Sequence, residues 1–149
     1  MAVLTRDIII NGYRRDDVFK WMSDFEVHAH FMKAGFPNLV QLDNQTLSLP
    51  FFGGYKQRTL IYRFIEADDR HEGRRIKLET DGKRLKGSLH YSLRTVKPST
   101  DTMVTIHMDY DAGSMLGKVL QGDLENHLAE CFVKALQELK SLLEAKASQ

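Results

Sequence analysis

The segment from Ser114 to the C-terminus constrains the fold of this chain more than any other. Its apolar side chains recur at alternating spacings of three and four residues, which is the pattern of one amphipathic helix. They are Leu116, Val119, Leu120, Leu124, Leu128, Cys131, Phe132, Ala135, Leu136, Leu139, Leu142 and Leu143. A helix of roughly 30 residues is about 45 Å long, so it needs an equally long apolar surface. We therefore expect a helix over roughly 115 to 145 that packs along the rest of the molecule.

Alternating apolar and polar residues predict that this surface is an antiparallel β-sheet. Several short segments between residues 37 and 111 alternate in this way, and turn signals such as Asp81-Gly82 separate them. Clean alternation indicates antiparallel strands with one buried face and one wet face. With a first strand over residues 3–11, the sequence predicts about seven strands. The predicted buried faces carry Leu60, Tyr62, Phe64, Ile76, Leu78, Leu89, Tyr91, Leu93, Ile106, Met108 and Tyr110.

Two short helices are predicted between the first strand and the rest of the sheet. Asp16 and Asp17 suit the first turn of the first helix. Ser23 and Glu26 have the spacing of a capping box at the start of the second helix, which we expect to end at Gly35. Because the pair is too short to form its own core, it is expected to close one end of a larger structure.

The order of elements is a strand, two short helices, about six strands and a long helix. Its most informative segments are Asp7-Ile8-Ile9-Ile10-Asn11, Asp17-Val18-Phe19-Lys20-Trp21-Met22-Ser23-Asp24 and Leu136-Gln137-Glu138-Leu139-Lys140-Ser141-Leu142-Leu143-Glu144. In this organisation the chain resembles the START-related helix-grip superfamily (SRPBCC), which includes polyketide cyclases and dehydrases, lipid-transport proteins and plant pollen-allergen-like proteins. It departs from the family pattern after the first strand, where Tyr13-Arg14-Arg15 replaces the expected proline.

The resemblance implies an α+β helix-grip fold formed by residues 1–149 as a single domain. In such a fold a curved antiparallel sheet wraps around the long C-terminal helix, with the two short helices after the first strand. A cavity usually lies between the sheet and the long helix. The resemblance therefore implies an internal site for a hydrophobic small molecule.

The inner faces of the predicted sheet and helix supply the candidate ligand-binding residues. They are Leu60, Tyr62, Phe64, Leu78, Leu89, Tyr91, Ile106, Met108, Tyr110, Leu120, Leu124, His127 and Leu128. Three of them are tyrosines, and a buried phenol needs a hydrogen-bond partner. An apolar pocket with a few polar groups is typical of a small-molecule site. The alternative is that the same side chains pack together as a solid core.

This candidate site is expected to hold a ligand without a catalytic residue. A phenol has a pKa of about 10 in water, and burial raises it, so we expect the tyrosines to stay protonated at neutral pH. His127, one residue before Leu128 at the edge of the helix stripe, is the best candidate for a general base. The sequence leaves open whether the chain is an enzyme and favours binding alone.

The sequence predicts neither a metal site nor a cofactor. His28 and His30 form a His-Ala-His sequence, but on a helix their side chains point about 200 degrees apart and cannot share an ion. No Cys or carboxylate has convincing metal-ligand spacing, and no Gly-rich phosphate-binding loop is present in the sequence.

Composition and charge limit the partners and the compartment. A formal net charge of +1 argues against a nucleic-acid-binding protein. The longest aliphatic run, Ile8-Ile9-Ile10, is too short for a membrane span, and the single cysteine, Cys131, excludes an internal disulfide. These features predict a cytoplasmic protein without a transmembrane segment and leave its oligomeric state open.

A basic segment offers a different kind of surface. Between residues 70 and 86, basic residues outnumber acidic ones, which predicts either soluble hairpin tips or a docking surface for an anionic group. The basic residues are Arg70, Arg74, Arg75, Lys77, Lys83, Arg84 and Lys86.

Glycines near the start of the long helix also have two interpretations. Gly113, Gly117 and Gly122 each weaken a helix relative to alanine. They indicate either a mobile entrance to the pocket or a frayed helix start that lies close to the sheet.

Three functional hypotheses follow from the sequence. The leading one is binding or transport of a hydrophobic small molecule (lipid, polyketide or quinone-like) in a cavity between the sheet and the C-terminal helix. The second is a polyketide cyclase- or dehydratase-like enzyme that uses a pocket tyrosine or His127. The third is an interaction protein that docks through the basic hairpins at residues 70–86.

Overall fold

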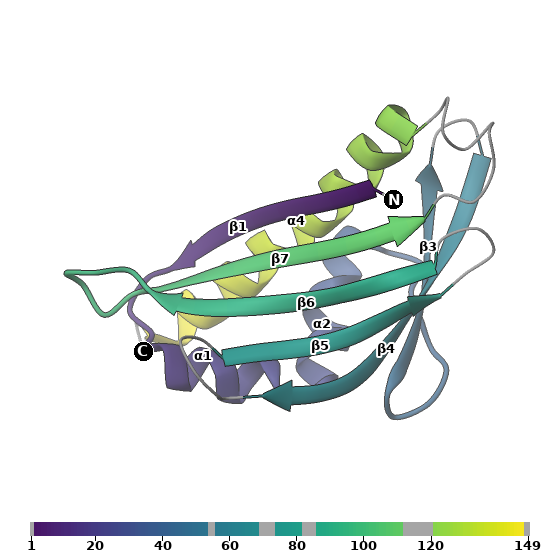
Figure 1. Cartoon of the computed structure of the whole chain (residues 1–149). Coiled ribbons are helices and arrows are strands. Elements are labelled where there is room, and N and C mark those ends of the chain that lie inside the picture. The colour runs from purple at the N-terminus through teal and green to yellow at the C-terminus, as the bar shows by residue number, and fades with distance from the viewer. Residues whose placement is uncertain (1, 54–55, 69–73, 82–85, 112–120, 148–149) are drawn as a thin grey trace.

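The elements follow the order that the sequence predicts, ending in a long C-terminal helix (Figure 1). The computed structural model describes residues 2–53, 56–68, 74–81, 86–111 and 121–147, with side chains described for residues 3–51, 59–64, 87–109 and 126–146. The elements are β1 (Ala2–Ile10), α1 (Arg15–Met22), α2 (Phe25–Gly35), β2 (Val40–Gln41), β3 (Thr46–Gly53), β4 (Lys56–Asp68), β5 (Arg74–Asp81), β6 (Lys86–Thr95), β7 (Thr102–Asp111) and α4 (Gln121–Ala147). The α+β class is confirmed.

The strands join in one antiparallel sheet in the order β1-β7-β6-β5-β4-β3-β2. The first strand therefore pairs with the last one, from Ala2 opposite Tyr110 to Ile10 opposite Thr102. α4 contacts β1 at one edge of the sheet and β3 near the other edge. Because the same helix contacts strands near both edges of the sheet, the sheet must curve around α4. The helix lies behind the sheet in Figure 1.

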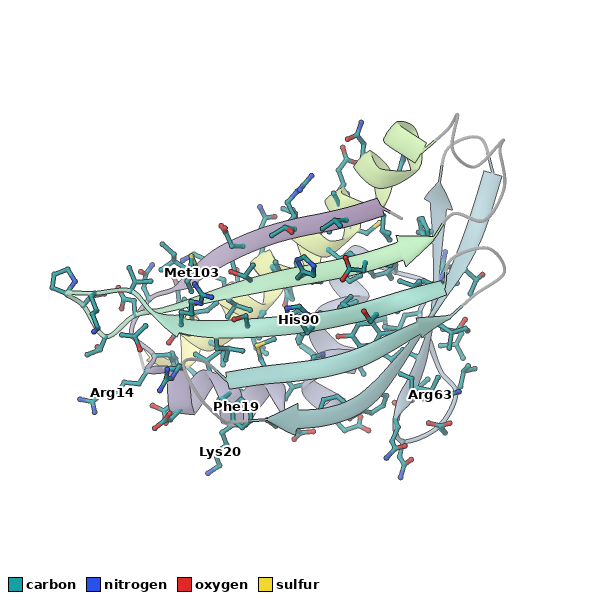
Figure 2. All side chains as sticks on the ribbon, viewed as in Figure 1. Arg14, Phe19, Lys20, Arg63, His90 and Met103 are labelled. Atoms are coloured by element: carbon teal, nitrogen blue, oxygen red, sulfur yellow. The ribbon has the colours of Figure 1, made fainter. Side chains whose placement is uncertain are left out.

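The predicted facing of the strands is confirmed wherever their side chains are described. Leu60 and Tyr62 of β4 are fully buried, whereas Arg63 is exposed. Figure 2 shows His90 on the outer face of β6, away from the helices. The buried apolar residues of β6 and β7 are Leu89, Tyr91, Leu93, Val104, Ile106 and Met108. The inner face of the sheet is thus the face that the sequence pattern predicts.

Most described side chains of the predicted apolar stripe of α4 are buried, and Leu142 is partly exposed. The fully or almost fully buried members of the stripe are Leu128, Phe132, Ala135, Leu136, Leu139 and Leu143. Cys131 is partly buried beside them, and burial raises the pKa of its thiol. The predicted helix start near residue 115, with Gly113 and Gly117, lies outside the described residues. Neither α4 nor any other helix in the described ranges has the length and apolarity to cross a membrane.

The start of α2 differs from the predicted capping box. Asp24 is the N-cap, and its Oδ1 accepts a hydrogen bond from the backbone N–H of Glu26 at 2.9 Å. Ser23 instead ends α1, where its Oγ donates to the carbonyl of Phe19 at 2.7 Å. Asp is as good an N-cap as Ser, so the helix begins one residue later than predicted.

Gly35 ends α2 as predicted, but close helix packing is the reason for the glycine. A Cβ at this position would lie 1.9 Å from the carbonyl oxygen of Cys131 in α4. No side chain fits in that space. The glycine therefore lets the backbones of α2 and α4 touch, which holds α2 against the long helix.

Candidate functional site

The candidate site surrounds His28, which α2 carries into the interior on the inner side of the sheet. His28 is fully buried and shares the buried side of α2 with Phe31 and Met32. His30 is exposed, so the two histidines lie on opposite sides of the helix, as helix geometry predicts. α2 therefore places one polar ring in surroundings that are mostly apolar.

Hydrogen bonds fix the position of the hydrogen on the His28 ring. Its Nε2 lies 2.6 Å from the carbonyl oxygen of Met22, at the end of α1. A carbonyl only accepts, so Nε2 must carry the hydrogen and donate it. Burial lowers the pKa of His28 to about 4, although the Met22 carbonyl and the Asp24 carboxylate act in the opposite direction. At neutral pH the ring is therefore neutral, and its Nδ1 is an acceptor.

Two tyrosines from different strands complete the polar part of the site. Tyr62 of β4 and Tyr91 of β6 lie on either side of β5, and both are fully buried. The Tyr62 hydroxyl oxygen lies 2.9 Å from His28 Nδ1 and 2.9 Å from the Tyr91 hydroxyl oxygen. Burial raises the pKa of both phenols, so both stay protonated at neutral pH. We refer to His28, Tyr62 and Tyr91 as the buried polar chain.

Aromatic rings and a thioether enclose this chain. The centroid of the His28 ring lies 5.0 Å from that of Phe31 and 5.6 Å from that of Phe64, which it meets edge-on. The Tyr91 hydroxyl oxygen lies 3.8 Å from Met32 Sδ. The phenylalanine rings offer no conventional hydrogen-bonding group, and the thioether sulfur is only a weak acceptor. A polar group that entered this region would therefore meet the buried polar chain first.

The predicted ligand-binding residues that the structure describes lie mainly in this interior. Those that are fully buried are Leu60, Tyr62, Leu89, Tyr91, Ile106, Met108 and Leu128. Phe64 is partly buried, and His127 is a partly exposed residue of α4. Leu120 and the side chains of Leu78, Tyr110, Leu124 and the basic residues 70–86 lie outside the described residues. The role of all these residues in ligand binding stays a prediction.

Sequence reasoning missed His28 and chose His127 as the candidate histidine. A signal for His28 was present, because helical spacing places it on the same face of α2 as Phe31 and Met32. Its contact with Tyr62, however, joins residues that are 34 positions apart. That contact depends on how α2 packs over the sheet, which the local pattern does not specify.

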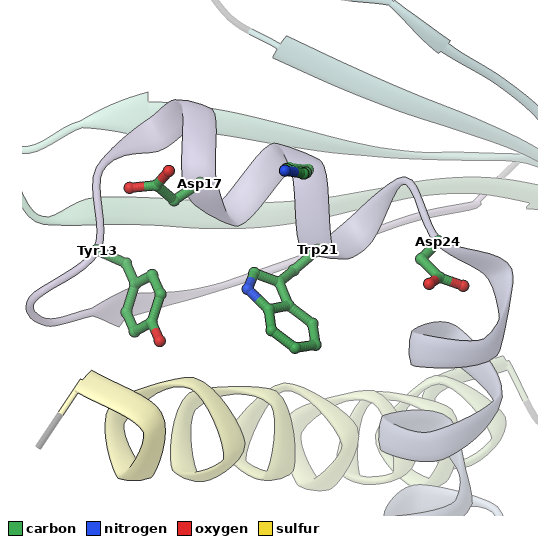
Figure 3. A pocket seen from close by; sticks show the side chains of 5 residues that line it. Tyr13, Asp17, Trp21 and Asp24 are labelled. Atoms are coloured by element: carbon green, nitrogen blue, oxygen red, sulfur yellow. The ribbon is translucent and has the colours of Figure 1, made fainter. Parts of the chain in front are cut away.

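A separate hollow of about 410 Å³ lies at the surface beside α1 (Figure 3). Its lining residues are Tyr13, Asp17, Lys20, Trp21 and Asp24. The Lys146 ammonium lies 4.8 Å from the centroid of the Trp21 ring, a cation–π contact within the chain. A second hollow of about 670 Å³ includes Arg6 of β1 and Glu130 of α4. Neither hollow contains a predicted ligand-binding residue, so we assign the candidate site to the interior.

Comparison with known proteins identifies the fold class. No protein-family model matches the sequence, and no curated protein matches it. A protein from Thermus thermophilus is similar in structure, with a TM-score of 0.66 and 10% identity over 97% of this chain and 99% of that chain. Truncated norcoclaurine synthase from Thalictrum flavum has a TM-score of 0.66 and 11% identity over 95% of this chain and 92% of that chain.

A protein described as belonging to the START superfamily, from Mycobacterium smegmatis, has a TM-score of 0.54. It is 15% identical over 92% of this chain and 98% of that chain. Identities this low show the fold alone. The chain has a START-like fold, as its sequence organisation indicates.

Proposed function

We propose that the chain binds or transports a hydrophobic small molecule, such as a lipid, polyketide or quinone-like compound, in the cytoplasm. The ligand would lie between the inner face of the sheet and α4. The observation that supports this best is a polar chain of three rings buried in an interior of aliphatic and aromatic side chains. Apolar walls with a few fixed polar groups are what a small-molecule site requires.

Stability alone does not explain these polar groups. An internal hydrogen bond contributes only about 1 kcal/mol in net terms, and replacing both partners by apolar groups of the same shape is nearly neutral. An entirely apolar core would therefore be about as stable. Recognition of a polar group on an otherwise apolar ligand gives the buried polar chain a purpose.

A cyclase- or dehydratase-like enzyme is the second candidate, because norcoclaurine synthase shares the fold and is by name an enzyme. The chemistry of the buried polar chain favours binding over catalysis. Burial lowers the pKa of His28, which makes its ring a weak base, and raises the pKa of Tyr62 and Tyr91, which makes them weak acids. General acid–base catalysis is most efficient with a pKa near the working pH.

Titration with an environment-sensitive apolar dye tests the proposed binding. Leu128→Trp adds bulk at a fully buried position among the predicted ligand-binding residues, and we expect it to weaken dye binding by about tenfold. Leu139→Trp is the matched control, because Leu139 is equally buried on the same helix but is not among those residues. Both variants strain the core to a similar extent, so thermal melts should report similar destabilisation for the two.

Mass spectrometry of the purified protein supplies a measurement that does not depend on variants. We expect an organic extract to contain a co-purifying apolar molecule. A wild-type protein that neither binds the dye nor carries such a molecule would contradict the proposal. Equal loss of dye binding in Leu128→Trp and Leu139→Trp would contradict the location between the sheet and α4.

A further inference from the structure

The buried polar chain contains one hydrogen fewer than it has hydrogen-bonding contacts. The contacts run from the Met22 carbonyl through His28, Tyr62 and Tyr91 to Met32 Sδ, with distances of 2.6, 2.9, 2.9 and 3.8 Å. The two ends, a carbonyl oxygen and a thioether sulfur, only accept. A neutral imidazole and two phenols supply three hydrogens for these four contacts. One contact must therefore lack a hydrogen.

The geometry decides which contact lacks it. Nε2 of His28 donates to the Met22 carbonyl, which leaves Nδ1 as a lone-pair acceptor. At 2.9 Å the Tyr62 hydroxyl must donate to Nδ1, because two facing lone pairs would repel. The Tyr62 hydrogen is then used. On distance alone either phenol could donate across their 2.9 Å contact, so beside a neutral His28 ring we deduce that Tyr91 donates to Tyr62.

Tyr91 consequently presents an acceptor, and not a donor, at the Met32 end of the buried polar chain. If the Tyr91 hydrogen is used toward Tyr62, the contact left without a hydrogen is the 3.8 Å one between the Tyr91 oxygen and Met32 Sδ, which is the longest of the four. Within the described part of the structure, no other group donates to the Tyr91 oxygen. Met32 has a flexible, unbranched side chain that can move aside for a ligand.

We propose that the ligand is an apolar alcohol or phenol whose hydroxyl donates a hydrogen bond to the Tyr91 oxygen beside Met32. This inference rests on the proposed function and narrows its ligand class. A ketone, ether or carboxylate in the same place would bring its own lone pairs against those of Tyr91. To accept such a group, both phenolic hydrogens would have to reverse, and Nδ1 of His28 would lose its donor. Sites built around one hydrogen bond discriminate strongly against ligands that cannot form it.

Competition with the apolar dye tests the inference with pairs of ligands that differ only in the donor. Suitable pairs are 4-octylphenol with 4-octylanisole and 2-dodecanol with 2-dodecanone. We expect the wild-type protein to bind each donor at least about tenfold more tightly than its partner. Dye binding without this preference overturns the inference but leaves the proposed function standing. Absence of dye binding and of ligand binding overturns both.

Two variants separate recognition from a merely structural role. Tyr91→Phe removes the acceptor, so the preference should fall because the phenol and the alcohol bind more weakly. Tyr62→Phe frees the hydrogen of Tyr91, so the preference should fall because the ether and the ketone bind more tightly. Equal changes for both members of each pair would contradict the inference.

The nitrogen chemical shifts of His28 give a readout that needs neither ligand nor variant. In the wild-type protein at pH 7 we expect the neutral ring with its hydrogen on Nε2. A hydrogen on Nδ1, or a doubly protonated ring, would make His28 the donor to Tyr62 and would reverse the hydrogen bonds along the buried polar chain. Either result overturns the inference.

Discussion

His28 shows how burial of one polar residue makes the stability of the protein depend on pH. Its ring is fully buried, and the pKa of His28 falls to about 4 because burial penalises the charged form. In the unfolded chain the ring has its ordinary pKa of 6.5. The unfolded state therefore binds more protons than the folded state between pH 4 and pH 6.5. Stability should be highest above this window and should fall as the pH is lowered through it.

The first residue-scale prediction concerns this pH dependence. Between pH 7 and pH 5, the depressed pKa of His28 should reduce the free energy of unfolding by about 2 kcal/mol. His28→Gln retains an N–H for the Met22 carbonyl but does not titrate, so this part of the pH dependence should disappear. Urea unfolding at the two pH values measures the difference for each protein.

His30→Gln is the matched control, because His30 is exposed on the opposite side of α2. Its pH dependence should equal that of the wild-type protein. If His28→Gln loses as much stability as the wild-type protein between pH 7 and pH 5, His28 is not held neutral by burial.

Among the elements, α2 determines the site because it carries both His28 and Met32 and packs on α4. Gly35 sets the distance between these helices, since a Cβ there would lie 1.9 Å from the Cys131 carbonyl oxygen. Any displacement of α2 would also shift His28 relative to Tyr62. The close approach of two helices and the hydrogen bonds of the site are therefore linked through one element.

Gly35→Ala should lower the free energy of unfolding by about 2 kcal/mol, because α2 and α4 must separate to accept the methyl group. The better helix propensity of alanine, about 1 kcal/mol, offsets only part of this strain. Ala34→Ser adds one atom at the neighbouring exposed position and should change stability by less than about 0.5 kcal/mol. Urea unfolding measures the free energy of unfolding of both variants. A neutral or stabilising effect of Gly35→Ala would show that α2 and α4 are not in close contact at Gly35.

For the molecule as a whole, the sequence predicts the layers better than it predicts the site. The stripe of α4 and the facing of Tyr62 and Tyr91 follow from periods that each element carries by itself. The polar chain instead needs Tyr62 and Tyr91, 29 positions apart, to converge across β5 on a histidine of α2. Such convergence depends on sheet curvature and helix placement, which no local period encodes. For the same reason the N-cap and the packing role of Gly35 required the structure.

Hydrogen bonds join the C-terminal part of α4 to the end of β1. Lys140 Nζ donates to the Ile9 carbonyl at 2.6 Å and forms an ion pair with Glu144 Oε2 at 2.6 Å. The same carboxylate oxygen accepts from the backbone N–H of Asn11 at 3.0 Å. Partial burial opposes ionisation, but the hydrogen bonds from Lys140 and Asn11 keep the pKa of Glu144 below its usual value. β1 is an edge strand, so these bonds help to keep the curved sheet closed around α4.

The whole-molecule prediction is that Lys140→Met loosens this closure. It removes the bond to the Ile9 carbonyl and the partner of Glu144, and it should lower the free energy of unfolding by about 1 kcal/mol, since the pair is partly exposed. Lys134→Met, at an exposed position of the same helix, should change stability by less than about 0.5 kcal/mol. Amide hydrogen exchange should become faster in β1 of Lys140→Met than in β6, which lies inside the sheet. Uniform exchange in both strands would mean that the bonds add global stability without holding the edge of the sheet to the helix.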